Sequence, residues 1–203
     1  MTREQVWYFV GLDLGQSHDY SALAVVERTL LILDEIDHVT YERLHVRQFR
    51  LRFLERVRLG TPYPDVVERV RRLVRGKPLV GRCTLVMDAT GVGAPVLDLL
   101  RRSSLGCVIE PVILTGGDRQ SHTGGVWRVP KPDLVTGLLV MLEKSELRFS
   151  KRVAGIEALR KELSCFGARR SDQHDDLVMA LALSCWRAGR RQDGIWGTRS
   201  LGL

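Results

Sequence analysis

The chain has 203 residues, of which 44% are hydrophobic, so we expect one folded domain with a sizeable core. Its formal net charge of +7 favours an anionic partner. No signal peptide is visible and no apolar run is long enough to span a membrane, which predicts a soluble intracellular protein without a membrane partner. The four cysteines are far apart and form no CxxC pair, which argues against a zinc site and a disulfide framework.

The first quarter of the chain predicts an antiparallel meander. Apolar runs predict strands over Val6–Leu14 and Ser21–Val26, and a third strand within Tyr41–Leu51. The acidic segment Leu31–Val39 between the last two reads as a turn-like link.

Helices and strands alternate in the rest of the chain. Apolar residues at helical spacing predict helices over 60–74, 92–102, from Pro132 onward, 156–166 and 175–187. Strands are predicted over 83–87, 107–113 and, at a sheet edge, 147–149. The Gly-rich segment 115–125 predicts a long polar loop. We expect one domain over 1–190, followed by a flexible tail over 191–203.

This order of elements predicts an α/β protein with an RNase H-like mixed sheet. Such a sheet joins an antiparallel meander to parallel strands and carries helices on both faces. Its first and fourth strands lie side by side, which would make Asp13 and Asp88 neighbours. A C-terminal helix packed across the sheet would bring Asp175 or Asp176 to the same point.

Three acidic motifs carry the candidate chemistry. Asp13 closes the first apolar strand, Asp88 closes the strand at 83–87, and Asp175 and Asp176 open a strongly apolar helix. A carboxylate at such a position is costly to bury without a partner. Carboxylates from separate elements indicate hard divalent cations such as Mg²⁺ or Mn²⁺, two of which can support phosphodiester cleavage. The alternative reading is an Asx-turn at Asp13 and helix capping by the other acids.

Further candidates surround these motifs. His174 could be a ligand, a proton shuttle or a group that orients phosphate, and Asp19 a second acceptor or a turn residue. Arginine suits phosphate because its planar fork can bond two oxygens. Candidate DNA contacts, with solvated surface as the alternative for Arg128 and Lys131, are Arg47, Arg50, Arg52, Arg128, Lys131, Arg169 and Arg170.

The ordered motifs resemble the nuclease domain of phage terminase large subunits. The segments that carry the resemblance are LGTPYPDVVERV, DATGVGAPVLDLL, VPKPDLVTGLLVMLEKSELRF, LRKELSCFG and HDDLVMALALSCW, and the likeness spans about Val6 to Trp186. The resemblance implies a two-metal endonuclease that cuts concatemeric viral DNA during packaging in the cytoplasm of the host bacterium. By position, Asp13 would bridge two Mg²⁺ or Mn²⁺ ions, Asp88 would complete one site, and Asp176, with or without Asp175, the other.

The resemblance also implies partners. These are double-stranded DNA, an ATPase motor, small terminase and portal proteins, and the isolated domain would be monomeric. The chain has no GxxxxGK[ST] phosphate loop, so it does not itself translocate DNA. Whether it is an excised domain, a stand-alone nuclease or a prophage remnant stays open, as do the physiological metal and any sequence specificity.

Three other functions fit parts of the sequence. GLDLGQSHDYSALAVVE also resembles the first phosphate-binding hairpin of actin-like ATPases and sugar kinases, although no second hairpin follows. A resolvase-like nuclease that cuts branched DNA would share the fold and the acids. The third is a module that only binds DNA or a packaging partner. The intact set of acids argues against it, because binding alone does not need them.

Overall fold

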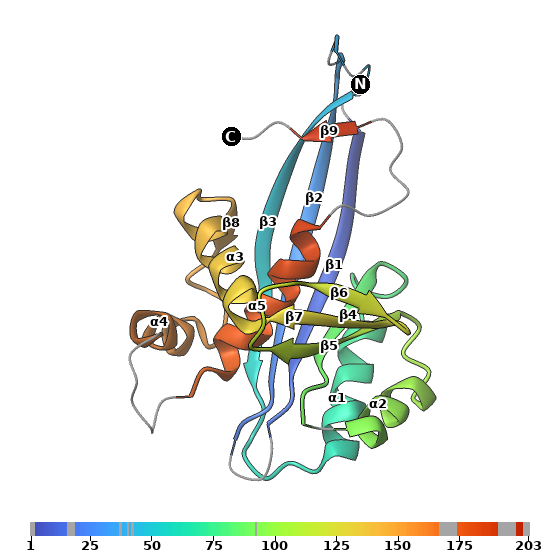
Figure 1. Ribbon diagram of the computed structural model, residues 1–203, viewed down its shortest axis with the longest axis vertical. Helices are drawn as coiled ribbons and strands as arrows, with labels where there is room; N and C mark the ends of the chain where they lie inside the picture. The colour runs from blue at the N-terminus through green and yellow to red at the C-terminus, as the bar shows by residue number, and fades with distance from the viewer. Residues whose placement is uncertain are drawn as a thin grey trace.

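In the computed structural model, the described residues form one nine-stranded mixed sheet with helices packed on it (Figure 1). The structure describes residues 3–15, 19–36, 38–39, 41, 43–91, 93–166, 174–190 and 198–200. The strands are β1 Arg3–Asp13, β2 Ala22–Ile36, β3 Arg43–Arg56, β4 Cys83–Asp88, β5 Val108–Thr115, β6 Ser121–Thr123, β7 Val126–Pro130, β8 Leu147–Phe149 and β9 Thr198–Ser200. The helices are α1 Tyr63–Arg75, α2 Gly93–Arg102, α3 Lys131–Glu143, α4 Ile156–Cys165 and α5 Asp176–Gly189.

The strand order is that of an RNase H-like fold. It runs β6-β7-β5-β4-β1-β2-β3-β8, with β9 also paired to β3. β1, β2 and β3 are antiparallel neighbours, whereas β4 is parallel to β1, β5 to β4 and β7 to β5. β1 and β4 lie side by side as predicted, with Leu12 opposite Met87.

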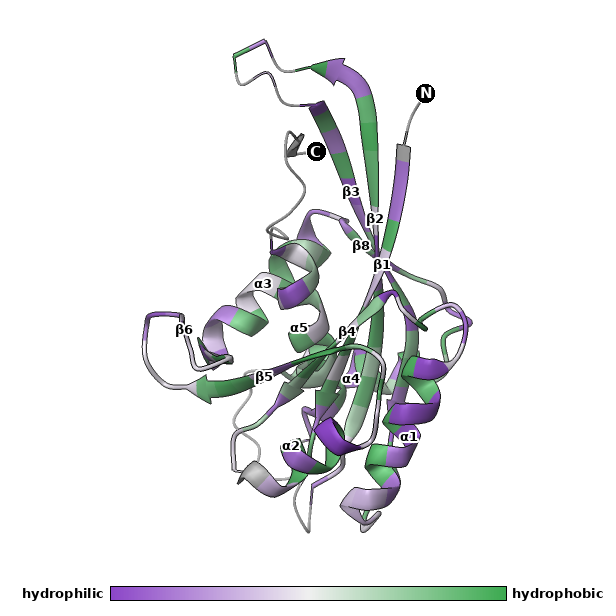
Figure 2. Cartoon of the chain, turned by 90° about the vertical axis from the view of Figure 1, so that its right-hand side faces the viewer, coloured by the Kyte–Doolittle hydropathy of each residue, from purple (hydrophilic) through white to green (hydrophobic). Residues whose placement is uncertain are grey.

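Helices cover both faces of this sheet because successive side chains of its strands point to opposite sides. On β1, Phe9 packs into the core beneath α3, α4 and α5, whereas Val10 and Leu12 pack into the core beneath α1 and α2. Figure 2 shows the resulting bands of polar and apolar residues along β3. The predicted fold class, with helices on both faces, is confirmed.

α5 is the most deeply buried helix. It crosses β1 and β2 and also contacts β3 and β4 (Figure 1). Eleven of its residues are buried, from Asp176 to Ala188, in agreement with the apolar sequence of this segment. Its path is fixed against Gly11, because a Cβ at that position would collide with the backbone of Ala180.

Two strands run well past the C-terminal ends that the sequence predicts. β2 continues to Ile36 and β3 to Arg56. The prediction of a turn-like link over Leu31–Val39 is therefore wrong for residues 31–36, which belong to β2. Leu30 and Ile32 stay buried in the extended strand, and its acidic end is exposed. β1, β2 and β3 consequently form a long ribbon that projects beyond the helices (Figure 1).

The Gly-rich segment contains regular structure that the sequence analysis missed. β6 pairs antiparallel with β7, and Gly124 and Gly125 connect them with φ of 61° and 75°. Positive φ at both central residues is what a tight hairpin of this kind requires. β6 therefore replaces part of the expected loop, and β7, which follows that loop, pairs with β5 and buries Val129.

The predicted flexible tail lies mostly outside the described residues. Within it, the short strand β9 pairs in parallel with β3. Flexibility of the other tail residues and the boundary at residue 190 stay predictions. Among the helices that the structure describes, none is long and apolar enough to cross a membrane. All four cysteines are free thiols.

Candidate functional site

Asp13 and Asp88 end two neighbouring parallel strands. Asp13 is the last residue of β1 and follows Gly11 on the face covered by α5. Asp88 is the last residue of β4 and follows Val86, which packs into the same core. Because the strands are parallel, both carboxylates leave the sheet at the same edge.

α5 brings two more carboxylates to this edge. Ala180 lies over Gly11, so Asp176, one turn earlier in the helix, lies near the end of β1. The pKa of Asp13 is raised well above its ordinary value, first by burial and then by the charges of Asp88, Asp176 and Asp175. The acids of the other two motifs therefore all lie close enough to Asp13 to act on its carboxylate.

Burial also raises the pKa of Asp88 and Asp176. At Asp88, the N–H of Thr90 donates to Oδ1 at 2.7 Å and opposes the shift. Burial raises the pKa of Asp176 to about 6, against the charges of Arg56 and His174, and this residue is only 6% exposed. A buried carboxylate with a raised pKa is typical of functional sites, although structural ion pairs produce it too.

Two cationic side chains lie among the acids. Lys131, the first residue of α3, places Nζ 2.9 Å from Oδ2 of Asp175, and its charge lowers the pKa of Asp13. Arg56, the last residue of β3, places Nε 3.7 Å from Oδ2 of Asp176. The sequence analysis gave Lys131 as a candidate DNA contact, with solvated surface as the alternative, and gave Arg56 no individual role.

Glu162 is the acidic residue that the sequence analysis missed. It lies on α4, is 9% exposed and contacts both Arg56 and the first turn of α5. It follows Leu159 by three positions, which places it on the buried face of an amphipathic helix. The sequence could have identified Glu162, because it is an acidic residue at a helical position that the apolar spacing predicts to be buried.

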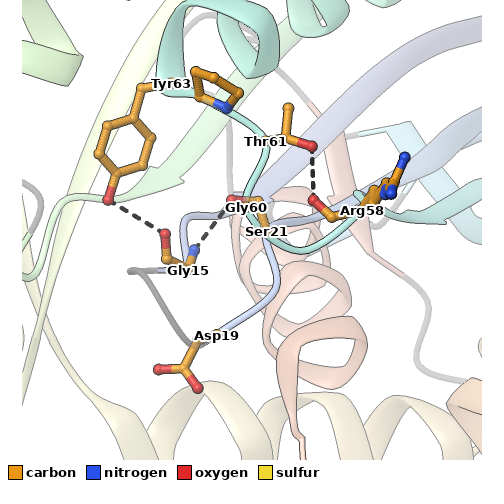
Figure 3. Close-up of a pocket in the computed structure, with 8 residues that line it drawn as sticks. Gly15, Asp19, Ser21, Arg58, Gly60, Thr61 and Tyr63 are labelled. Atoms are coloured by element: carbon orange, nitrogen blue, oxygen red, sulfur yellow. Dashed lines mark hydrogen bonds between the residues drawn. The ribbon is translucent and has the colours of Figure 1, made fainter.

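His174 and Asp19 flank the acids. His174 is exposed, with Nδ1 3.9 Å from Oδ2 of Asp176 and its ring edge-on to Tyr20 at 4.9 Å between centroids. Asp19 is exposed, and its charge helps to raise the pKa of Asp176. It lines a pocket of about 200 Å³ together with Gly15 and Tyr63, and its carboxylate points away from their hydrogen bond (Figure 3).

Three of the predicted DNA-binding arginines have partners inside the protein. Arg47 donates to the carbonyl of Gly189 at 2.9 Å, at the C-terminal end of α5. Arg50 and Arg52 both bond Glu27, which lies opposite Tyr8 on the face of the sheet away from Asp13.

The other predicted DNA contacts differ in position. Arg128 is exposed on β7, and Lys131 lies beside Asp175. Arg169 and Arg170 lie outside the described residues. DNA contact by any of these residues stays a prediction.

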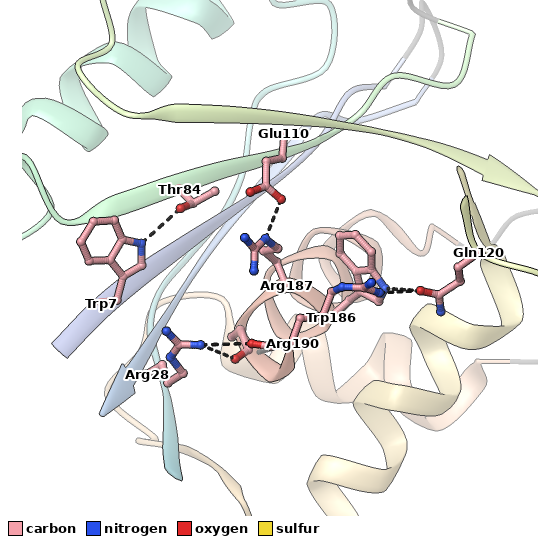
Figure 4. Close-up of polar contacts among 9 residues, drawn as sticks. Trp7, Arg28, Thr84, Glu110, Gln120, Trp186, Arg187 and Arg190 are labelled. Carbon is pink, nitrogen blue, oxygen red and sulfur yellow. Dashed lines mark hydrogen bonds and ion pairs between the residues drawn. The ribbon is translucent and has the colours of Figure 1, made fainter. Parts of the chain in front are cut away.

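Polar contacts also fix the C-terminal end of α5 (Figure 4). Arg28, buried on β2, donates to the carbonyls of Ala188 and Arg190 at 3.2 and 3.3 Å. Arg187 bonds Glu110 of β5 at 2.6 Å. Cationic side chains suit the carbonyls at a helix C-terminus. These contacts hold the helix that carries Asp176 in one position on the sheet.

The acids fit a divalent cation by chemistry but not by spacing. Hard cations prefer carboxylate oxygens, and Oδ2 of Asp176 is buried without a hydrogen-bond partner. Within the part of the chain that the structure describes, however, no group of three or more His, Cys, Asp or Glu side chains is close enough to hold a metal ion. Asp175 and Asp176 instead face Lys131 and Arg56.

Comparison with known proteins adds little to this description. No protein-family model matches the chain, and no curated protein matches it. Among solved structures, T. thermophilus RuvC in complex with Holliday junction substrate is 13% identical, with 88% of this chain and 91% of that chain covered and a TM-score of 0.29. A likeness at this TM-score does not bear on function. The RNase H-like class follows from the strand order, and the resemblance to terminases stays a prediction.

Proposed function

We propose that this chain is a divalent-metal-dependent endonuclease that hydrolyses DNA phosphodiester bonds. The observation that carries the proposal is the meeting of Asp13, Asp88, Asp175 and Asp176 at one edge of an RNase H-like sheet. Burial and mutual repulsion raise the pKa of Asp13 well above its ordinary value. Such carboxylates are stabilised when cations share them.

The proposed ligands follow the positions of the acids. Asp13 is central to the set, Asp88 lies on the β4 side, and Asp176, with Asp175, on the α5 side. Divalent cations held by these carboxylates would supply the chemistry of the reaction, since they would lower the pKa of a water molecule and stabilise the departing 3′ oxygen. Within the protein, Lys131 and Arg56 offset part of the negative charge of the acids. A divalent cation that binds Asp175 and Asp176 would therefore replace these two ion pairs.

We further propose that the substrate is concatemeric phage DNA and that cleavage serves packaging. The support is the ordered resemblance of five segments to terminase nuclease domains, together with the net charge of +7. Contacts to the DNA backbone give salt-dependent and largely sequence-independent binding. Translocation then belongs to a separate ATPase motor, and small terminase and portal proteins position the domain.

A plasmid-cleavage assay tests the proposal. Wild-type protein is incubated with Mn²⁺, Mg²⁺ or EDTA beside D13N and D88N, with D98N on the exposed surface of α2 as the matched control. We expect cleavage with metal, none with EDTA, none by D13N or D88N, and wild-type cleavage by D98N. Folded wild-type protein that cleaves with neither metal would contradict the proposal.

The same assay separates the packaging enzyme from a resolvase. A four-way junction and a linear duplex of equal length are offered together. Preferential, symmetrical cutting of the junction by a dimer would favour a resolvase-like nuclease. Comparable cutting of the linear duplex by a monomer is the outcome expected for a packaging nuclease.

A further inference from the structure

The N-terminus of α5 is capped by a residue from another helix. Asp175 holds the N-cap position but makes no capping hydrogen bond with its side chain. The first amides of a helix need acceptors from outside the helix. Oε2 of Glu162, on α4, accepts the N–H of Val178 at 3.0 Å. The carboxylates of Asp175 and Asp176 are thus not used to cap their own helix.

The second oxygen of Glu162 holds a cation beside Asp176. Oε1 accepts a hydrogen bond from Nη2 of Arg56. Nε of Arg56 forms an ion pair with Oδ2 of Asp176 at 3.7 Å but no hydrogen bond. The guanidinium also lies over the ring of Tyr20, 5.0 Å from its centroid. Glu162 and Asp176 are only 9% and 6% exposed. Because buried charges need well-placed partners, the stability of each carboxylate depends on where the Arg56 guanidinium lies.

We propose that Glu162 is a positioning residue for Asp176. It fixes the first turn of α5 through Val178, and it keeps Arg56 from pairing fully with the Asp176 carboxylate. An arginine fork released from Glu162 would bond both oxygens of Asp176, because bidentate pairing is the favoured geometry. Glu162 therefore preserves Oδ2 of Asp176 as an acceptor for a divalent cation. This inference rests on the proposed nuclease function.

Two substitutions separate the roles of Glu162. In E162Q, the amide oxygen can still accept the Val178 N–H, but the charge that holds Arg56 is lost. In E162A, both contacts are lost. In the double variant E162Q/R56Q, the cation that would close on Asp176 is absent as well. E157Q, on the exposed face of the same helix, is the matched control.

Mn²⁺ binding to the full chain without DNA, followed by calorimetry, is the first measurement. We expect E162Q to bind Mn²⁺ about tenfold to a hundredfold more weakly, the usual effect of losing a residue behind a metal ligand. E162Q/R56Q should recover most of that loss, and E157Q should bind like wild type. In cleavage assays, kcat of E162Q should fall while KM for DNA stays unchanged, because neither Glu162 nor Arg56 is assigned to DNA.

Metal-free NMR keeps this inference separate from the nuclease proposal. Hydrogen exchange at Val178 should stay slow in E162Q and become fast in E162A, and the Asp176 carboxyl ¹³C signal should move in E162Q. Unchanged Asp176 signals in E162Q, or wild-type Mn²⁺ affinity in that variant, would overturn the positioning role. A wild-type protein that neither binds Mn²⁺ nor cleaves DNA would instead overturn the proposed function, and the NMR result would still decide the contacts of Glu162.

Discussion

The backbone of Ala180 occupies the space that a side chain on Gly11 would take. A Cβ on residue 11 would lie 2.9 Å from the carbonyl carbon of Ala180 and 3.0 Å from the backbone nitrogen of Ser184. Only glycine allows α5 to approach β1 this closely. The approach matters for the site because Asp13 follows Gly11 by two residues and Asp176 precedes Ala180 by one turn.

We therefore expect Gly11→Ala to destabilise the protein by about 1–3 kcal/mol, the usual cost of overpacking a close contact. Denaturant unfolding of wild type and variant measures the difference. Gly137→Ala is the matched control, because Gly137 lies in α3 with nothing within 4 Å of an added Cβ. Alanine there should stabilise by about 0.5–1 kcal/mol through helix propensity. Equal effects of the two substitutions would refute the close approach.

Asp13→Asn should raise the free energy of unfolding at pH 7 in buffer with EDTA. Burial and the neighbouring carboxylates raise the pKa of Asp13 in the folded protein, so folding disfavours its charged form. The stability associated with protonated Asp13 is complete below its unfolded pKa of about 3.9 and is lost as the pH rises through the folded value. Asparagine avoids that loss, and the advantage should disappear near the unfolded pKa.

Unfolding curves measured at several pH values test this sign. Asp98→Asn, at an exposed position on α2, should stay within about 0.5 kcal/mol of wild type throughout. A D13N variant less stable than wild type at pH 7 would show that the carboxylate of Asp13 is stabilised rather than strained by its surroundings.

Glu27 should show the opposite pH dependence. Burial, the largest influence, favours a higher pKa, but the hydrogen bond and charge of Arg52, with contributions from Tyr8 and Arg50, outweigh it and lower the pKa. The ionised pair therefore stabilises the fold above the unfolded pKa of about 4.3, and this stability is lost as the pH falls through the folded value.

Glu27→Gln should accordingly cost about 1.5 kcal/mol at pH 7, at the low end for charged hydrogen bonds because Arg52 is half exposed. The difference from wild type should shrink at acid pH. Free energies of unfolding at pH 7 and pH 3 provide the comparison. A difference that grows at pH 3 would mean that the pKa of Glu27 is raised in the fold.

Arg47 and Arg128 should differ in what they support. Arg47→Ala should cost about 1–2 kcal/mol of stability, because Arg47 bonds the carbonyl of Gly189 at the end of α5. Arg128→Ala should leave stability unchanged and weaken DNA binding, with the slope of log affinity against log salt reduced by about one. Unfolding and salt titrations on both variants give the answer. A reduced salt slope for Arg47→Ala alone would restore Arg47 as the DNA contact.

Local pattern was sufficient to predict most elements of this chain. A few neighbouring residues are enough to recognise the strands before Asp13 and Asp88 and the helix around Leu159. β8 was predicted at its observed bounds. The order of these elements then predicted the sheet with β1 beside β4. β7 was missed because a five-residue strand ending in Pro130 gains its stability from pairing with β5, which no local pattern records.

The sequence by itself determined the acidic motifs, their places at the ends of strands and a helix, and the fold that joins them. Only the tertiary structure decided which cations and acceptors surround them. Glu162, Arg56 and Lys131 come from three further elements, and Arg47 bonds a backbone carbonyl 142 residues away. The reason is physical: secondary structure follows from interactions within a few residues, whereas the partner of a buried charge depends on how distant elements pack.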